Sequence, residues 1–420
     1  MTDATFAAIV GAAHVAPGRP DDAVDGRVPA FVVRPGSAGE VQACVRAVRA
    51  DGGALVVRGL GAHLDRGAPP ERVDVVVALD RLARVLDHQF GDMTVTVEPG
   101  CPLTALAATL ASAGQWLPLD PPLPDGTTVG GLIAADLSGP LRATQGRVRD
   151  LLLGVRVVDG AGNVVVGGGR VVKNVAGYDI PKLHVGALGT LGVIVEATFK
   201  VRPRPEREEA VVVACRSIAV AAETALALLD DAVPPFWLEL AGPGGLAEGP
   251  GDGAAVVAGV AGIAAEVADG RRRMLDAARA RGIHAVGVAD GAALRGRLAG
   301  FAAEPAAAVL RAATLPTDVG ACVDAFAAAG APVRCLAHVA SGVVRVTVTR
   351  AVDVPALVAR LRPRLEARGG SLVVERAPAA IKADVDPWGD PGPALALMRG
   401  VKAAFDPDRV LAPGRLVAGI

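Results

Sequence analysis

The chain has 420 residues, which is enough for two or three domains with complete hydrophobic cores. Hydrophobic residues make up 51% and charged residues 21%, a balance typical of globular proteins. Since 43 Lys and Arg residues stand against 44 Asp and Glu residues, the net charge of −1 gives no electrostatic reason to expect nucleic acid or an acidic membrane surface as a partner.

The five cysteines lie far apart in the sequence, and no CxxC pair occurs. This spacing argues against a structural zinc site or an iron–sulfur cluster, and it is typical of a cytoplasmic protein with reduced thiols. The six histidines contain no HxH or HxxxH pair, so no metal site is expected. No apolar run is long enough to predict a transmembrane helix.

In chain order, residues 1–25 predict a short helix and a linker. A strand at Phe31–Val33, a helix that opens with a capping box from Ser37 to Glu40, and a strand at Ala54–Val57 follow. The chain then enters the glycine-containing loop RGLGAH, residues 58–63. Consecutive N–H groups in such a loop can cradle two phosphates without a lysine, although an ordinary turn is the alternative. Because the third glycine of GxGxxG is missing, a nicotinamide site is disfavoured.

Two further glycine-rich segments follow. Strands are expected at residues 73–79, 85–90 and 94–97, and a helix at 103–113. Residues 126–135 then place a TxGG sequence at the start of an apolar helix, where backbone N–H groups favour an anion. The segment GALGTLG, residues 186–192, precedes a predicted strand. Glycines at this spacing let the backbone approach a flat or charged ligand, although a tight helix-to-strand connection without a ligand is the alternative.

The sequence GGRVVKNVAGYDIPKLHVGALGTLGVIVEATFKVRPRP resembles, nearly residue for residue, a signature of flavoproteins with the vanillyl-alcohol-oxidase or PCMH-type FAD domain. Within that superfamily it is most similar to the FAD-binding E subunits of bacterial glycolate oxidase, also called glycolate dehydrogenase. The resemblance is dense from about Phe31 to Pro205 and returns at Asp406–Ile420. It implies FAD as the cofactor. The FAD is expected to be non-covalent, because His63 lies one position after the histidine that relatives attach to the flavin and should point away.

The resemblance places FAD against four parts of the chain. The cofactor-binding residues expected from it are Arg58, Gly59, Leu60, Gly61, Ala62, His63, Thr128, Gly130, Gly131, Ser138, Gly139, Arg149, Asp150, Gly189, Gly192, Val193 and Ile194. The chain departs from the family pattern at Ala62, Asp136, Gln145 and Ala412. These departures keep the FAD prediction and weaken any prediction about the substrate face.

After Pro205, strands and helices alternate in a way that predicts an antiparallel sheet backed by helices. The expected fold class is therefore α+β, with a two-subdomain PCMH-type FAD-binding domain followed by an α+β cap domain. The expected division is an N-terminal segment at 1–25, the FAD-binding domain at 26–205, a cap or substrate domain at 206–385, and a tail at 386–420 that returns to the FAD domain.

Oxidation of a 2-hydroxy acid on a flavin needs a cation for the carboxylate and a base for the hydroxyl proton. His184 is a candidate base, and His338 on a cap strand is a second one. Arg376 and Lys382 are candidate carboxylate-binding residues. For each of them a packed or solvated side chain without a catalytic role is the alternative. Tyr178, the only tyrosine, is expected to pack or hydrogen-bond near the cofactor.

The resemblance implies an FAD-dependent oxidoreductase that acts on CH–OH donors, oxidising glycolate or a similar D-2-hydroxy acid. It also implies a complex with a sister flavin subunit and an iron–sulfur subunit that pass electrons towards quinone. The missing histidine pair keeps a second hypothesis open, an accessory subunit that relays electrons or serves as a scaffold. The expected location is the cytoplasm, with contact to the inner face of the membrane only through partners.

Overall fold

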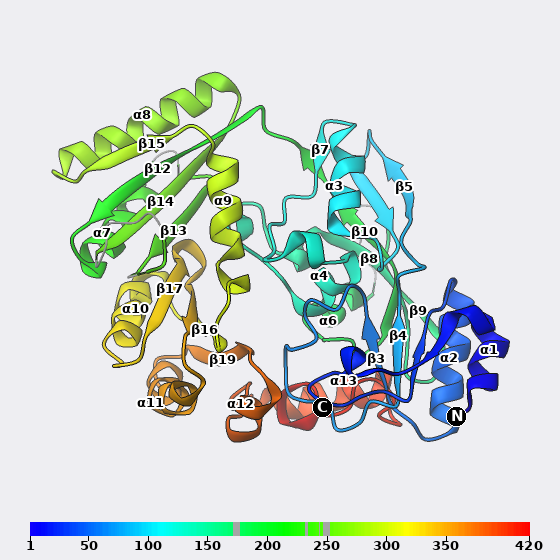
Figure 1. The fold of residues 1–420 in the computed structure, drawn as a ribbon. Helices are drawn as coiled ribbons and strands as arrows, with labels where there is room; N and C mark the ends of the chain where they lie inside the picture. Colours follow the sequence, from blue (N-terminus) through cyan, green and yellow to red (C-terminus); the bar gives the residue numbers. More distant parts are fainter. Residues whose placement is uncertain (171–176, 232–233, 243, 247–252) are drawn as a thin grey trace.

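The computed structural model describes residues 1–170, 177–231, 234–242, 244–246 and 253–420, so residues 171–176 of the glycine-rich signature lie outside the described residues. The described chain forms two parts (Figure 1). The first part contains the N-terminal half, and the second is built on one large sheet. The C-terminal segment, red in Figure 1, returns to the first part.

The first sheet has four strands, three of them parallel. In spatial order they are β1 (Val15–Pro17), β2 (Phe31–Val33), β4 (Val75–Ala78) and β3 (Leu55–Arg58). Helices α1 (Asp3–Val10) and α2 (Ala38–Ala50) pack beside it. The predicted capping box of α2 is changed by one residue: Ser37 accepts from the Glu40 N–H, but the Glu40 carboxylate accepts from the N–H of Gly36.

The second sheet is antiparallel and contains the strand that follows GALGTLG. Its strands are, in spatial order, β5 (Val85–Gln89), β6 (Thr94–Val97), β10 (Val193–Lys200), β8 (Leu152–Val158) and β9 (Val164–Gly168). Four helices accompany it: α3 (Leu103–Ala111), α4 (Val129–Ala135), α5 (Val148–Leu151) and α6 (Ile180–His184). Leu132 and Ile133 of α4 are buried in one hydrophobic cluster with Phe199 of β10, so the apolar face of α4 fixes its position on this sheet. A two-stranded ribbon, β7 (Gln115–Trp116) with β11 (Arg202–Pro203), lies near its edge.

The second part contains one eight-stranded sheet that is antiparallel throughout. Its strands are, in spatial order, β15 (Ala285–Val288), β12 (Arg207–Cys215), β14 (Ala254–Gly262), β13 (Trp237–Ala241), β17 (Val333–His338), β18 (Val343–Val348), β16 (Ala308–Ala313) and β19 (Ser371–Arg376). One hydrophobic cluster joins this sheet to α7 (Ile218–Leu229), α8 (Ala264–Ala280), α10 (Val319–Ala327) and α11 (Val354–Glu366). The predicted α+β cap, an antiparallel sheet backed by helices, is confirmed.

Helix α9 (Gly291–Ala299) packs separately from those four helices and lies on the side of the cap that faces the first part (Figure 1). Its Leu294 and Leu298 share a cluster with Trp237 of the cap sheet and Leu141 of the first part. The contact between the two parts is therefore partly apolar.

The tail contains α12 (Ala379–Asp384) and α13 (Ala394–Phe405) and ends against strand β3. Leu55 donates to the carbonyl of Val410, and its own carbonyl accepts from Ala412, which extends the first sheet by a short parallel bridge. The buried Lys402 ammonium donates to the carbonyls of Thr190 and Leu411. The tail therefore links the GALGTLG turn to strand β3 of the first sheet.

Candidate functional site

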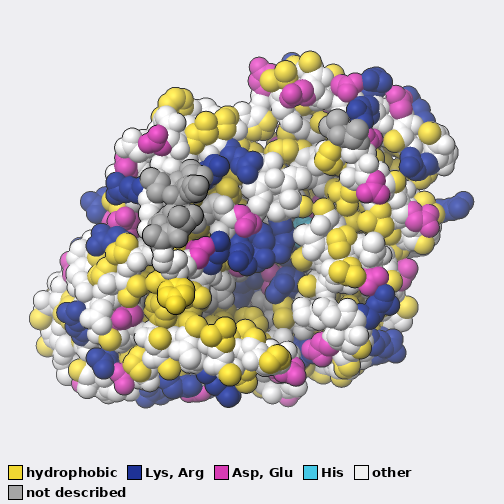
Figure 2. Space-filling model, turned by 180° about the vertical axis from the view of Figure 1, so that it is seen from behind, with side chains coloured by type: hydrophobic (Ala, Val, Ile, Leu, Met, Phe, Trp, Pro, Cys, Tyr) yellow, Lys and Arg dark blue, Asp and Glu magenta, His cyan; other side chains and the backbone are white. Residues whose placement is uncertain are grey.

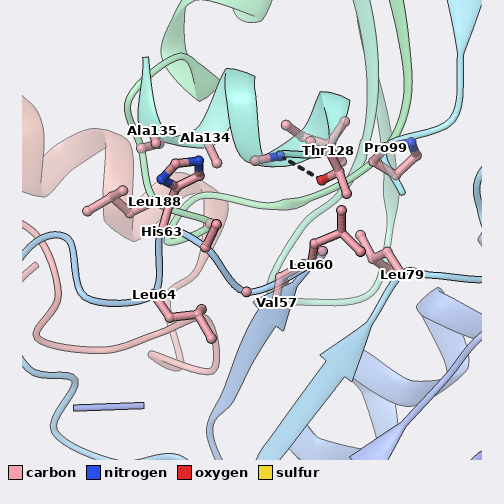
Figure 3. Close-up of a pocket in the computed structure, with 18 of the residues that line it drawn as sticks. Val57, Leu60, His63, Leu64, Leu79, Pro99, Thr128, Ala134, Ala135 and Leu188 are labelled. Carbon is pink, nitrogen blue, oxygen red and sulfur yellow. Dashed lines mark hydrogen bonds between the residues drawn. The ribbon is translucent and has the colours of Figure 1, made fainter. Parts of the chain in front are cut away.

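A glycine-lined cavity lies where three loops of the first part meet, and its volume is about 820 Å³, including the portion open to solvent. Figure 3 shows residues from the loop after β3, from α4 and from the turn before β10 around one space. Concave sites lined mainly by apolar side chains and backbone are typical of small-molecule and cofactor binding. The glycines that line it are Gly59, Gly61, Gly126, Gly130, Gly131, Gly189 and Gly192.

These glycines have two different structural roles. A Cβ on Gly59 would lie 2.3 Å from Thr128 Oγ1, and a Cβ on Gly130 would lie 2.9 Å from the Cβ of Pro99, so both allow close packing between loops. A Cβ on Gly61 would meet nothing within 3.7 Å, and one on Gly131 nothing within 3.4 Å. Gly61 also has a φ of +89°, which side chains rarely adopt. At Gly61 and Gly131 the missing side chain leaves room for a ligand.

The loop at residues 59–63 has the backbone donors that a diphosphate requires. Within the described chain, the N–H groups of these five residues donate to no backbone or side-chain acceptor. Unused N–H groups in a turn form a concave site for an anion. The start of α4 differs, because Val129 donates to the Cys101 carbonyl at 2.9 Å and Gly130 to the Pro99 carbonyl at 2.7 Å. At the start of α4, these N–H groups are already used in hydrogen bonds to backbone carbonyls, so the anion site expected there is not available. The free N–H donors are those of the loop at residues 59–63.

Two histidines line the cavity. The expectation that His63 points away is wrong, because its ring lies among the lining residues (Figure 3), with Nε2 2.8 Å from Thr127 Oγ1. The reason is the left-handed turn at Gly61, which breaks the alternation of an extended backbone. His184 is only 2% exposed, and its Nε2 has no partner among the described residues. Burial lowers the pKa of each ring to about 4, so both histidines are neutral at pH 7.

A second cavity, of about 700 Å³, adjoins the first and shares the lining residues Ala135 and Leu188 with it. Figure 2 shows a hollow between the two parts of the molecule where Lys and Arg side chains gather. We call this second cavity the arginine pocket, because five arginines and only two carboxylates line it. The charged lining residues are Arg66, Arg142 and Arg147 from the first part, Arg311 and Arg345 from the cap, and the carboxylates Asp136 and Glu375.

Glu375 is held by two of these arginines. Its Oε1 accepts from Arg66 Nη1 at 2.9 Å, and its Oε2 accepts from Arg345 Nε at 3.2 Å. Burial alone would raise the pKa of Glu375, but Arg345, Arg66 and Arg311 hold it well below its usual range. Glu375 is therefore ionised at neutral pH and joins the loop after β3 to the cap.

Behind the arginine pocket, three side chains of the cap sheet form a buried chain of hydrogen bonds. Arg345 Nη1 donates to His338 Nε2 at 2.6 Å, and His338 Nδ1 lies 2.6 Å from Glu239 Oε1. Burial, together with the charge of Arg345, lowers the pKa of His338 well below its usual value, so His338 is neutral with its proton on Nδ1. The role of His338 that these contacts support is to orient Arg345.

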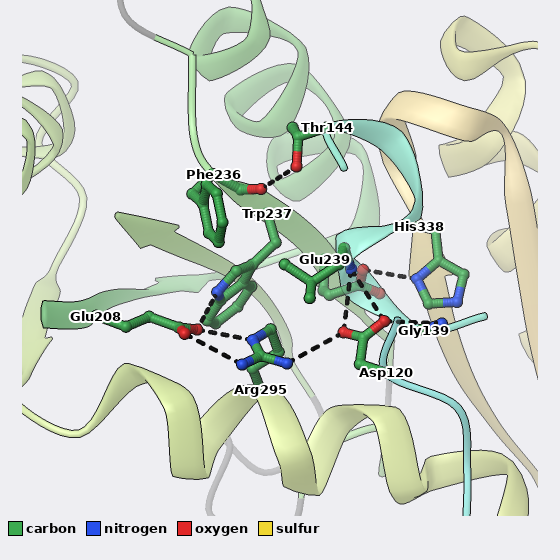
Figure 4. Close-up of polar contacts among 10 residues, drawn as sticks. Asp120, Gly139, Thr144, Glu208, Phe236, Trp237, Glu239, Arg295 and His338 are labelled. Carbon is green, nitrogen blue, oxygen red and sulfur yellow. Dashed lines mark hydrogen bonds and ion pairs between the residues drawn. The ribbon is translucent and has the colours of Figure 1, made fainter. Parts of the chain in front are cut away.

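A second polar group joins the two parts of the molecule (Figure 4). Arg295 of α9 binds Glu208 through Nε at 2.8 Å and Asp120 of the first part through Nη1 at 3.4 Å. Asp120 also accepts from the backbone N–H of Gly139 at 3.1 Å. Burial raises the pKa of Asp120 to about 6 although Arg295 opposes this shift. These contacts hold the cap against the first part beside the arginine pocket.

The structure brings together many, but not all, of the residues expected to bind FAD. Those lining the glycine-lined cavity are Gly59, Leu60, Gly61, Ala62, His63, Thr128, Gly130, Gly131, Gly189, Gly192 and Ile194. The others lie outside its lining: Arg58 pairs with Asp22, Ser138 accepts from Arg142, Gly139 donates to Asp120, Asp150 caps α5, Arg149 is exposed, and Val193 is in the core.

The candidate catalytic residues are also spread apart. His184 lines the glycine-lined cavity but not the arginine pocket. Arg376 donates to the Glu304 carbonyl at 3.0 Å, and Lys382 pairs with Asp25 at 2.5 Å. The side chain of Tyr178 is 93% exposed and does not line the glycine-lined cavity, so the expected packing is not found, and a hydrogen bond near the cofactor stays a prediction.

The arginine pocket was missed in the sequence, although a signal for two of its residues is present. Arg345 is the only charged residue in the strand VVRVTV, and Arg311 is the only one in AVLRAA. The two face each other across β16 and β18. A single arginine inside an apolar strand indicates a polar site on one face of the sheet.

Comparisons with known proteins agree with this architecture. Residues 29–168 match the model of the FAD binding domain, and residues 246–416 match the C-terminal domain of FAD linked oxidases. The structure is similar to p-cresol methylhydroxylase, with a TM-score of 0.76 at 15% identity over 98% of this chain and 95% of that one. It is also similar to alkyldihydroxyacetonephosphate synthase, with a TM-score of 0.68 at 18% identity over 93% and 78% of the two chains. At these identities the similarity concerns the fold.

Among curated proteins, the chain is 41% identical over 152 residues to glycolate oxidase subunit GlcE of Escherichia coli, covering 36% of this chain and 43% of the relative. It is 34% identical over 192 residues to D-2-hydroxyglutarate dehydrogenase of Xanthomonas citri pv. viticola, covering 46% and 41%. The chain thus matches about two fifths of the length of these relatives. Its cofactor is FAD, which the glycine-lined cavity with its free N–H groups fits. The chain therefore combines two matched domains of FAD-linked oxidoreductases, an FAD binding domain and an FAD-linked oxidase C-terminal domain.

Proposed function

We propose that this chain binds FAD non-covalently in the glycine-lined cavity and oxidises the C2 hydroxyl group of a 2-hydroxy acid such as glycolate. The observation that carries the proposal is that a pocket rich in arginine opens directly beside this cavity. Arginine binds carboxylates through two parallel hydrogen bonds, so the pocket suits the acid group of the substrate. Relatives named as glycolate oxidase subunits and D-2-hydroxyglutarate dehydrogenases support this substrate class.

FAD bound in the glycine-lined cavity would supply the acceptor for the hydride of substrate C2. The chain must therefore place C2 at the boundary between the two cavities, where Ala135 and Leu188 lie. These two small or apolar side chains leave space there and keep water away from the reacting carbon. In this arrangement the arginines orient the acid, and the glycine loops orient the cofactor.

The hydroxyl proton also needs an acceptor, and Asp136 is the one that the pocket offers. Asp136 Oδ2 pairs with Arg147, while its Oδ1 is buried and has no hydrogen-bond partner in the described part of the chain. Both oxygens of Glu375 are already engaged by arginines. We therefore assign Asp136 Oδ1 as the base, in place of His184, which does not line the arginine pocket.

The non-covalent attachment is supported by the geometry of His63. Its Nε2 lies within hydrogen-bond distance of Thr127, and its ring is neutral at pH 7. Precipitation of the FAD-loaded chain with acid should therefore release the flavin into the supernatant. Yellow colour that stays with the precipitated protein would contradict non-covalent binding.

We further propose that the chain works in a complex with a sister flavin subunit and an iron–sulfur subunit that carry electrons towards quinone, in the cytoplasm or at the inner face of the membrane through these partners. The similarity to a glycolate oxidase subunit supports this proposal. Within the described residues, no helix has the length and apolar character needed to cross a membrane. Co-purification of the tagged chain tests the complex, and a chain that is isolated alone with full activity would contradict it.

A second candidate function is that of an accessory subunit whose FAD only relays electrons. One observation favours it: among the described residues, no group of three His, Cys, Asp or Glu side chains could hold a metal ion. Without a metal, the alkoxide that forms during oxidation has only hydrogen bonds and arginines to stabilise it.

One experiment separates the two candidates. The FAD-loaded chain is mixed with a 2-hydroxy acid in the absence of oxygen, and the visible flavin absorption is followed. Loss of the oxidised flavin bands with the chain alone supports substrate oxidation at this site. Bands that persist with the chain alone, but disappear once partner subunits are added, would support the relay function instead.

A further inference from the structure

Two buried titratable side chains of the cap sheet, Glu239 and His338, take no part in the proposed oxidation. They are 0% and 3% exposed. Burial raises the pKa of Glu239 and lowers that of His338, so keeping both inside the sheet is unfavourable by itself. Glu239 stands directly opposite His338 on the neighbouring strand, and Arg345 lies on the next strand, two residues beyond the position opposite His338. This register places the three side chains on one face of the sheet, where Arg345 lines the arginine pocket.

Arg345 fixes the direction of each hydrogen bond in this buried chain. An arginine can only donate, so Nε2 of His338 must accept the bond from Arg345 Nη1, at 2.6 Å. The proton of the neutral ring then lies on Nδ1 and is donated to Glu239 Oε1, also at 2.6 Å (Figure 4). Glu239 therefore keeps this proton away from Nε2. If the proton moved to Nε2, two donors would face each other, and Arg345 would lose the contact.

Arg345 is the pocket arginine whose guanidinium is fixed on two edges. Its Nε donates to Glu375 at 3.2 Å, and its Nη1 donates to His338. Within the described chain, each of the other four arginines of the pocket has at most one side-chain hydrogen-bond partner. Arg345 Nη2 forms no hydrogen bond with any described residue. The third edge of this guanidinium is therefore available to a carboxylate, in an orientation that the protein has already set.

We propose that Glu239 and His338 are positioning residues that hold Arg345 ready for the carboxylate of the 2-hydroxy acid. The inference rests on the proposed function, because it takes the arginine pocket as the site of the acid. His338 acts by accepting from Arg345, and Glu239 acts through the proton on His338. Without them the acid itself must order the long side chain of Arg345. Ordering one such side chain should weaken binding of the acid by about two- to tenfold.

Two substitutions of His338 separate positioning from packing. His338→Asn places an amide nitrogen near the position of Nδ1, where it can still donate to Glu239, but its side chain is too short to accept from Arg345. His338→Gln is one methylene longer and can accept from Arg345. The probe is 2-hydroxyisobutyrate, which has the carboxylate and hydroxyl of a 2-hydroxy acid but no hydrogen at C2, so it binds without reducing the flavin. Its dissociation constant is measured by calorimetry on the full-length, FAD-loaded chain at pH 7.5.

His338→Asn should weaken binding of this acid by about two- to tenfold, and His338→Gln should restore most of it, with FAD affinity unchanged in both. His88→Asn is the matched control, because His88 also hydrogen-bonds to a side chain, Gln115 at 2.8 Å, but lines neither cavity. If His338→Asn does not fold, as judged by its melting curve, Glu239→Leu replaces it with the same expected loss. An unchanged acid affinity in the folded variant, or an equal loss in His338→Asn and His338→Gln, would overturn the inference.

The outcomes also separate this inference from the proposed function. If His338→Asn weakens binding of the acid but no 2-hydroxy acid reduces the flavin of the unmodified chain, the proposed oxidation fails and the positioning role stands. If 2-hydroxy acids reduce the flavin while the folded variants bind 2-hydroxyisobutyrate as tightly as the unmodified chain does, the positioning role fails and the proposed function stands. An unmodified chain that does not bind this acid would also overturn the positioning role.

Discussion

Gly131→Val is expected to remove FAD binding without damaging the protein. Gly131 lies in α4 and lines the glycine-lined cavity. A Cβ there would stay 3.4 Å from Thr128 Oγ1 and 4.0 Å from His63, so the backbone tolerates a side chain that then fills the ligand's space. Because Val is no worse than Gly in a helix, the free energy of unfolding without FAD should change by less than about 0.5 kcal/mol.

The loss of cofactor affinity should be much larger. Overfilling a packed site costs about 1–3 kcal/mol, which corresponds to a dissociation constant for FAD that is roughly ten- to hundredfold higher. The assay is a titration of the FAD-free chain with FAD, followed by flavin fluorescence, together with a thermal melt. Gly400→Val is the matched control, because Gly400 also lies in a helix and a Cβ on it would meet no heavy atom within 4 Å.

The result that would refute the reasoning is a folded Gly131→Val chain that binds FAD as tightly as the control. Gly130, the neighbouring glycine, is less informative. A Cβ on Gly130 would lie 2.9 Å from the Cβ of Pro99 and 3.0 Å from its carbonyl oxygen. Its replacement would disturb the start of α4 as well as the cavity, so loss of FAD there would not identify the cause.

Three further predictions concern the pocket and its surroundings. Asp136→Asn should slow flavin reduction by about 10²–10⁴-fold and leave FAD affinity within a few-fold. Rapid mixing with a hydroxy acid that shows an unchanged rate would exclude Asp136 as the base. His184→Leu should make the free energy of unfolding less sensitive to acid. Burial lowers the His184 pKa to about 4, so only the unfolded chain binds a proton at this residue as pH falls from 6.5 to 4. In the unmodified chain this proton uptake lowers the free energy of unfolding by up to about 3 kcal/mol. Urea unfolding at pH 7 and 4.5 measures this, and an equal loss in variant and unmodified chain would contradict it. Lys382→Met should destabilise the fold by about 3–5 kcal/mol, because it leaves Asp25 buried and unpaired. Its FAD affinity should stay unchanged, and a specific loss of that affinity in a folded variant would place Lys382 in the ligand site.

Much of the fold follows from local pattern. The strand at Thr94–Val97 has the predicted bounds, because continuous β-branched residues between turns leave little choice. Helix α2 begins after Ser37 as expected, since the side chain of Ser37 satisfies a free N–H group at the helix start. These features depend only on residues close in the chain.

The arginine pocket could not be predicted in this way. Its charged side chains come from five separate places between Arg66 and Glu375, and only the packing of the cap on the first part brings them together. The direction of the His63 side chain was predicted wrongly for a related reason. The backbone of Gly61 has a left-handed conformation, which changes the alternation of side-chain directions along the loop. Sequence pattern therefore identified the loops that line the glycine-lined cavity, whereas the arginine pocket depended on tertiary structure.

The central claim is that this chain's own FAD receives the hydride of a 2-hydroxy acid. The most direct measurement is rapid anaerobic mixing of the FAD-loaded chain, without partners, with malate that carries either hydrogen or deuterium at C2. The account predicts that the flavin bands disappear and that deuterium slows their loss, because the C2–H bond breaks in that step. Bands that persist with either form of malate, and equally with glycolate, would contradict it.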